Sequence, residues 1–149
     1  MSHAVSRTVW ETMGLLLFAL PAAAQSLFHR AENQVQVVLV KIVRTASNTE
    51  IQLQTQKAMT GICWYENSDN SPYLLADGQR LRYLGGANVT PCPGKHSYAS
   101  QEIMILRFEP LPAQTRMFSL VEGRGGENQM IDPKSSKETF WNFLRIKLD

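Results

Sequence analysis

The chain has 149 residues, and its 15 lysines and arginines nearly balance its 13 aspartates and glutamates, which gives a net charge of +2. This length fits one domain, and a hydrophobic fraction of 44% is typical of a globular chain and excludes a disordered one. Because the basic residues are scattered among acidic ones, the sequence also excludes the basic stripe of a general nucleic-acid binder.

The N-terminal segment has the three parts of a secretory signal peptide. Arg7 precedes an apolar run over residues 13–20, and three alanines close the segment at Ala24. The apolar run is well short of the roughly 20 residues that a membrane-spanning helix needs. Small residues are the ones that precede a signal-peptide cleavage point. We therefore predict a signal-peptide helix over residues 1–24.

Cleavage between Ala24 and Gln25 would release a single domain over residues 25–149. The exported chain would then be secreted or would lie in the periplasm. The alternative is that the N-terminal segment stays uncleaved and anchors the chain. In that case this segment would be the contact with the membrane.

Alternating apolar and polar residues predict β-strands along the rest of the chain. Residues 36–44 and 49–55 alternate and are separated by a short turn, which is typical of an antiparallel hairpin. Ile51 and Leu53 would face inward in that hairpin. The sequence therefore predicts that these two strands pair with each other.

A second hairpin is predicted around the Asp-Gly pair at residues 77–78. Both residues tolerate the positive φ angles that a two-residue type I′ turn needs. This turn would pair Leu74 with Leu81 on the inner face and Tyr73 with Arg82 on the outer face. We expect a cation–π contact between Tyr73 and Arg82.

The last third of the chain predicts three more strands. Residues 102–109 are the strongest candidate for a central strand, and residues 116–122 form another. In the final run, apolar residues stand at even positions up to Leu148. Trp141 and Phe143 stand at odd positions, whose side chains would face the other side of the strand. A bulge near residue 143, or a strand covered on both faces, would resolve that conflict.

The two cysteines predict a disulfide between Cys63 and Cys92, because thiols of an exported chain meet an oxidising environment. The closed loop of about 30 residues would stabilise the fold by roughly 3–4 kcal/mol. Residues 85–94 are rich in glycine and proline and should not form a regular central strand, so the bond would tie an irregular loop to the sheet. Although His96 follows Cys92, one thiol and one imidazole are too few for a zinc site, and no metal or cofactor is expected.

Seven or eight short strands, with no segment of helical period after residue 24, predict an all-β fold. We expect a single antiparallel β-sandwich, immunoglobulin-like, preceded by the signal-peptide helix. The alternative is a small β-barrel.

The C-terminal third carries a resemblance. Its motifs are Phe108-Glu109-Pro110-Leu111-Pro112, Thr115, Phe118-Ser119-Leu120-Val121-Glu122-Gly123 and Trp141-Asn142-Phe143-Leu144-Arg145-Ile146. In this order they resemble a small β-sandwich domain of exported bacterial proteins, many of them from Bacteroidetes. The resemblance implies export and the sandwich fold. It implies no catalytic residue, because the family has none established.

Catalytic motifs are scarce in this sequence, which holds no phosphate-binding loop, no H-E-x-x-H and no G-x-S-x-G. Glu109 and Glu122 lie near strand ends and could serve a hydrolase if their carboxyl groups were within about 10 Å of each other. The alternative is that each carboxylate is solvated or paired with a nearby arginine.

The aromatic residues predict a binding surface instead. Tyr73, Tyr83 and Tyr98 could lie on the outside near the irregular loop, where exposed rings would form a platform for a sugar or a peptide. Our leading hypothesis rests on the signal peptide, the strand pattern and the scarcity of catalytic motifs, and is a non-catalytic exported protein that binds a protein or glycan partner at the bacterial cell envelope. The alternatives are a carbohydrate-binding or adhesin-like module and a hydrolase that uses Glu109 and Glu122.

Overall fold

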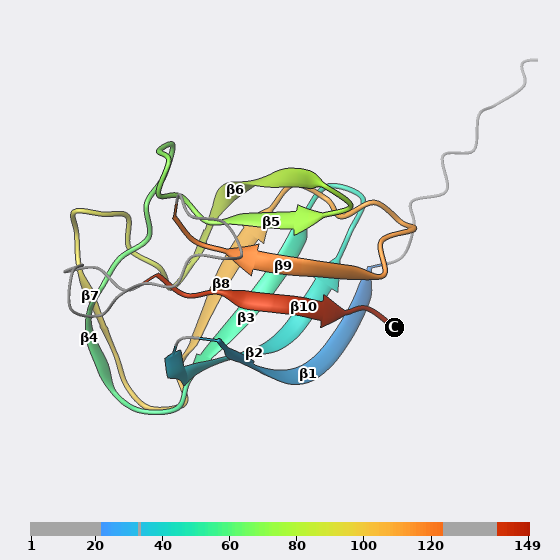
Figure 1. The fold of residues 1–149 in the computed structure, drawn as a ribbon. Helices are drawn as coiled ribbons and strands as arrows, with labels where there is room; N and C mark the ends of the chain where they lie inside the picture. Colours follow the sequence, from blue (N-terminus) through green and yellow to red (C-terminus); the bar gives the residue numbers. More distant parts are fainter. Residues whose placement is uncertain (1–21, 33, 124–139) are drawn as a thin grey trace, which may run out of the picture.

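A computed structural model describes residues 22–32, 34–123 and 140–149 (Figure 1). Most of the predicted signal peptide lies outside these residues. The described part contains ten strands and no helix: β1 (Ala23–Ala31), β2 (Gln34–Arg44), β3 (Thr49–Thr55), β4 (Met59–Ile62), β5 (Tyr73–Ala76), β6 (Gln79–Ala87), β7 (His96–Tyr98), β8 (Ile103–Phe108), β9 (Met117–Val121) and β10 (Phe143–Lys147).

Eight of the strands form one antiparallel sheet in the order β1-β2-β3-β8-β6-β5-β9-β10, and β4 pairs with β7 in a small second sheet. The large sheet curls until its two edge strands, β1 and β10, lie side by side (Figure 1). Glu32 donates a backbone hydrogen bond to Asn142 across this seam, and the amide of Gln25 bonds Lys147 and Asp149 at the other end. The predicted all-β antiparallel fold is confirmed, and the curled sheet is consistent with a sandwich or a small barrel.

Strand β6 turns the corner between the two halves of the sheet. Its first half pairs with β5 and its second half with β8, with a register shift between Tyr83 and Gly85. The prediction that the stretch from Gly85 could not join a central strand is therefore wrong for its first three residues. Glycine permits this arrangement, because Gly85 has a φ of +98° and a Cβ on Gly86 would lie 1.9 Å from the carbonyl oxygen of Ile105.

The core lies inside the curled sheet, and the alternating side chains of the predicted strands supply it. In β3 and β8, Ile51, Leu53, Met104, Leu106 and Phe108 are all completely buried. In β2 the residues that face the core stand at odd positions up to Leu39, and the next one is at an even position, Ile42. The change occurs because a register shift against β3 falls between Leu39 and Lys41. One extra residue in a strand exchanges its two faces, so simple alternation fails there.

The hairpin at residues 77–78 forms as predicted. Leu74 pairs with Leu81 and Tyr73 with Arg82, and both turn residues have positive φ angles. The predicted cation–π partner is wrong, because the guanidinium 4.4 Å from the Tyr73 ring centroid belongs to Arg80. Arg80 is the diagonal neighbour two residues from Arg82, within reach of a ring on the same face.

Strand β1 was not predicted. It begins at Ala23, so Ala23 and Ala24 pair with Arg44 and Val43 of β2. Cleavage before Gln25 would remove these two pairs and leave the pairing from Gln25 onward. The predicted processing point thus falls inside the first strand, near its exposed end.

Candidate functional site

The predicted disulfide is present in the structure, which joins Cys63 to Cys92. Beside it, the Trp64 N–H donates to the Thr90 carbonyl oxygen at 2.9 Å, and the Cys92 N–H donates to the Trp64 carbonyl oxygen at 3.0 Å. These bonds tie the segment after β4 to the loop that follows β6. We call this region, with the strands β4 and β7 and the rings of Trp64, Tyr83, Tyr98 and Trp141, the tied end.

The three tyrosines proposed as an exposed platform are all buried. Tyr73 and Tyr83 are each 8% exposed and Tyr98 is 2% exposed, so the prediction that their rings are exposed is wrong, although Tyr73 lies on the outer face under Arg80. The Tyr98 hydroxyl donates to the Asn88 carbonyl oxygen at 2.7 Å, and Tyr83 packs on Phe108 in the core. Since these rings are covered, they cannot form a flat surface for a partner.

The environment of two of these phenols raises their pKa values. Burial, together with the nearby carboxylate of Glu102, raises the pKa of Tyr98 from 10.0 to about 12. Burial also raises the pKa of Tyr83, with further contributions from Glu66, Tyr98 and Glu122. The protonated Tyr98 phenol is the donor of the hydrogen bond to Asn88. Among the described residues, Tyr83 Oη and the Trp64 indole N–H are buried with no hydrogen-bond partner.

The two carboxylates proposed for a hydrolase do not face a common cleft. Glu109 follows the core residue Phe108 and therefore points outward, where its carboxylate accepts the Arg82 backbone N–H at 2.8 Å. Glu122 has the same parity as the core residue Leu120 and is 5% exposed, and its carboxylate accepts the Trp141 backbone N–H at 2.9 Å. Because one lies outside the sheet and the other inside, the paired arrangement of that hypothesis is not formed.

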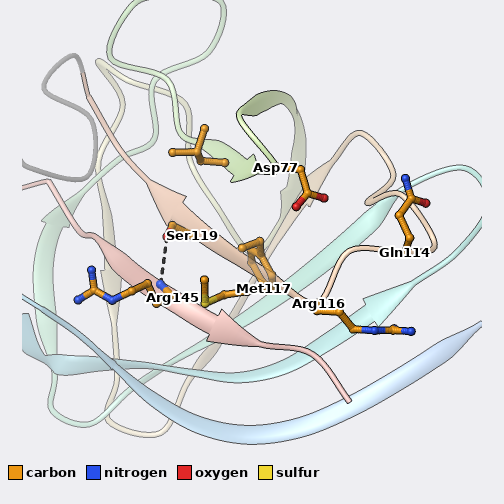
Figure 2. A pocket seen from close by; sticks show the side chains of 8 residues that line it. Asp77, Gln114, Arg116, Met117, Ser119 and Arg145 are labelled. Atoms are coloured by element: carbon orange, nitrogen blue, oxygen red, sulfur yellow. Dashed lines mark hydrogen bonds between the residues drawn. The ribbon is translucent and has the colours of Figure 1, made fainter.

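A pocket of about 500 Å³ lies on the outer face of β5, β9 and β10 (Figure 2). This volume is within the range of small-ligand sites, roughly 300–1,000 Å³. We call it the outer-face pocket, and its lining residues are Leu75, Asp77, Gln114, Arg116, Met117, Phe118, Ser119 and Arg145. Met117 is 46% exposed and supplies the apolar surface in the middle of the pocket, which we call its floor (Figure 2).

The backbone beside this pocket is strained at Arg145. The predicted bulge of the last strand is confirmed, because the register of β10 against β9 shifts between Phe143 and Ile146. Arg145 takes up the extra residue with a φ of +52°, and its N–H donates to Ser119 Oγ at 3.0 Å. A non-glycine residue in the left-handed region costs about 1–2 kcal/mol, and such strain is often found at functional sites.

The charged groups of the pocket are spread along it. Figure 2 shows Arg145 and Arg116 at opposite ends with Met117 between them, and Asp77 and Gln114 on the side of Arg116. Asp77 accepts a hydrogen bond from the Thr115 hydroxyl at 3.3 Å. In the part of the chain that the structure describes, no carboxylate lies within ion-pair distance of the Arg116 or Arg145 guanidinium.

Comparisons with known proteins found no protein-family model, no curated protein and no solved structure that matches this chain. Within residues 22–32, 34–123 and 140–149, no three histidine, cysteine, aspartate or glutamate side chains come together as metal ligands. No helix in the described residues is long and apolar enough to cross a membrane.

The outer-face pocket could not be found from the sequence, because its lining comes from three separate stretches of the chain. The pairing of β9 with β5 and with β10, and the bond from Arg145 to Ser119, bring these stretches together. One signal was detectable, namely the parity conflict at Phe143 that predicted the bulge. It marked the strained position without indicating what lies beside it.

Proposed function

We propose that this chain is an exported, non-catalytic protein that binds a partner at the bacterial cell envelope, and that the outer-face pocket is its binding site. The observation that carries the proposal is the pocket itself. It combines an open apolar floor at Met117 with two arginines that have no carboxylate partner among the described residues, next to a strained backbone position. Exposed apolar surface rimmed by polar groups is typical of interaction sites.

Export is supported by the signal-peptide pattern up to Ala24 and by the bond between Cys63 and Cys92, since disulfides persist mainly outside the reducing cytosol. The intact mass of the protein from its own cells tests this part of the proposal. We expect a chain that starts at Gln25 and takes up a thiol label only after reduction. A full-length chain with two free thiols would contradict export.

Binding can be tested by sedimentation of the full chain with isolated envelopes of the source cells. Met117→Glu places a charge on the pocket floor, and Leu84→Glu is a matched control because Leu84 is 48% exposed in β6 and does not line the pocket. We expect Met117→Glu to lose most of the sedimented fraction while Leu84→Glu keeps it. Equal sedimentation of wild type and Met117→Glu would contradict the pocket as the binding site.

A further inference from the structure

The lining of the outer-face pocket contains the groups that recognise one kind of ligand. Arg116 and Arg145 carry two positive charges, Asp77 carries one negative charge, and Gln114 adds an amide. Leu75 and Met117 add an apolar surface between them. The lining can therefore bind the carboxylates of a ligand through its arginines and the hydroxyl groups through its other polar side chains. The C–H groups of the ligand can pack on its apolar surface.

From this combination we propose that the pocket binds an acidic polysaccharide, with uronate carboxylates on Arg116 and Arg145 and a sugar ring over Met117. The inference rests on the proposed function and names its ligand class. A guanidinium binds a carboxylate through two parallel hydrogen bonds, which makes arginine the favoured residue for this contact.

The spacing of the charges favours a polymer over a single small anion. Arg145 and Arg116 lie at opposite ends of the pocket, with Met117 between them (Figure 2), which favours a separate carboxylate at each end over one carboxylate shared by both. Successive sugars of an acidic polysaccharide carry such separate carboxylates. Asp77 and Gln114, which lie toward Arg116, then meet hydroxyl groups, which donate to a carboxylate and accept from an amide.

The position of the pocket on a sheet face excludes one mode of peptide binding, the addition of a strand to a free sheet edge. Peptides that add to a sheet bind through the free N–H and C=O groups of an edge strand. The strand under the pocket, β9, is paired with β5 on one side and with β10 on the other. Its backbone therefore offers no edge, and recognition must come from side chains.

The experiment measures binding of the full chain to polygalacturonate, to neutral dextran and to poly-glutamate at low and high salt. The variants are Arg145→Asn and Arg116→Gln. Asparagine tolerates the left-handed backbone of position 145, so this variant removes the charge while the bulge is kept. Lys95→Gln is the matched control, because Lys95 is exposed in the loop before β7 and does not line the pocket.

We expect polygalacturonate to bind, with an affinity that falls as salt rises, and each arginine variant to lose affinity by about tenfold. Dextran should not bind, and the control should stay within about twofold of wild type. Tighter binding of poly-glutamate, or equal affinities of wild type and Arg145→Asn, would overturn the inference. If polygalacturonate does not bind while envelope sedimentation persists, the inference fails and the proposed function stands. If the wild type does not sediment with envelopes, the proposed function fails.

Discussion

The tied end and the outer-face pocket differ in which side chains they bury and which they expose. At the tied end, the rings of Trp64 and Trp141 pack edge to face at a centroid distance of 5.3 Å, and the phenols of Tyr83 and Tyr98 are buried. At the pocket, exposed Met117, Arg116 and Arg145 lie over a hydrogen-bonded sheet. The difference is that the aromatic rings of the tied end are buried in the fold, whereas the pocket exposes charged and flexible side chains.

The largest effect is expected from removing the disulfide of the tied end. Cys63→Ser combined with Cys92→Ser opens a loop with a sequence separation of 29 residues. Loop entropy then lowers the free energy of unfolding by roughly 3–4 kcal/mol. Urea denaturation measures the change. If the tied end were a separate binding device rather than part of the fold, the loss would be below about 1 kcal/mol.

The next effect is expected at the corner in β6. Gly86→Ala places a methyl group 1.9 Å from the Ile105 carbonyl oxygen, so β6 and β8 must separate. We expect a loss of about 3 kcal/mol, at the upper end of overpacking costs. Gly61→Ala is the control, because its Cβ meets nothing within 4 Å and only its φ of +72° is unfavourable. That control should lose about 1–2 kcal/mol, and a loss as large as that of Gly86→Ala would contradict the close approach.

Removing the hydroxyl group of each of two tyrosines at the tied end should affect the free energy of unfolding differently. Tyr98→Phe removes the hydrogen bond to the Asn88 carbonyl oxygen and should cost about 1 kcal/mol. Tyr83→Phe removes a buried hydroxyl with no partner among the described residues, so the unfolding free energy should stay unchanged or rise. Parallel urea titrations of the two variants test this, and a larger loss for Tyr83→Phe would contradict the packing described above.

The same phenols predict a loss of stability at high pH. The folded protein holds the Tyr98 proton more tightly than the unfolded chain does, because its pKa is raised from 10.0 to about 12. This stabilisation is complete below pH 10 and is lost as the pH rises through 12. We expect the unfolding free energy to fall over that interval, and to fall less in Tyr98→Phe. An identical pH dependence in wild type and variant would show that the phenol of Tyr98 is not perturbed.

The smallest effect is expected at the pocket, where position 145 can be relieved of strain. Arg145→Gly removes the Cβ at a φ of +52° and should raise the unfolding free energy by about 0.5 kcal/mol, after the entropy cost of glycine is subtracted. Arg145→Val should lower it, because a β-branched residue is an outlier in that region. Thermal unfolding of both variants provides the measurement. A more stable valine variant would mean that the backbone there is extended.

Strand positions and pairing could be predicted from the sequence, while the covering of the outer faces could not. Alternation predicted β2, β3, β8 and β9, and the pair at residues 77–78 fixed the register of β5 against β6. Alternation also placed Tyr73 on the outer face, yet it did not show that Arg80 would cover its ring. Strand β1 was missed because its first residues were assigned to the signal peptide.

The pocket could not be predicted from the sequence because its lining depends on which residue of β10 occupies the bulge and on which side chains of β9 it meets. The parity conflict at Phe143 indicated either a bulge near residue 143 or a strand covered on both faces. It did not indicate that Arg145 would occupy the bulge, or that Ser119 would accept its N–H. This bond depends on how β10 is aligned with β9, and the sequence alone does not show that alignment.

The most direct test of the division between the two regions is an amide NMR titration of the isotope-labelled full chain with oligogalacturonate. We expect chemical-shift changes at the amides of Leu75, Met117, Ser119 and Arg145, and none at Trp64, Tyr83 or Tyr98. That result would place the ligand on the outer face and leave the tied end as a structural element. Shifts confined to Trp64, Tyr83 and Tyr98 would contradict the account, because the buried aromatic end would then be the binding site.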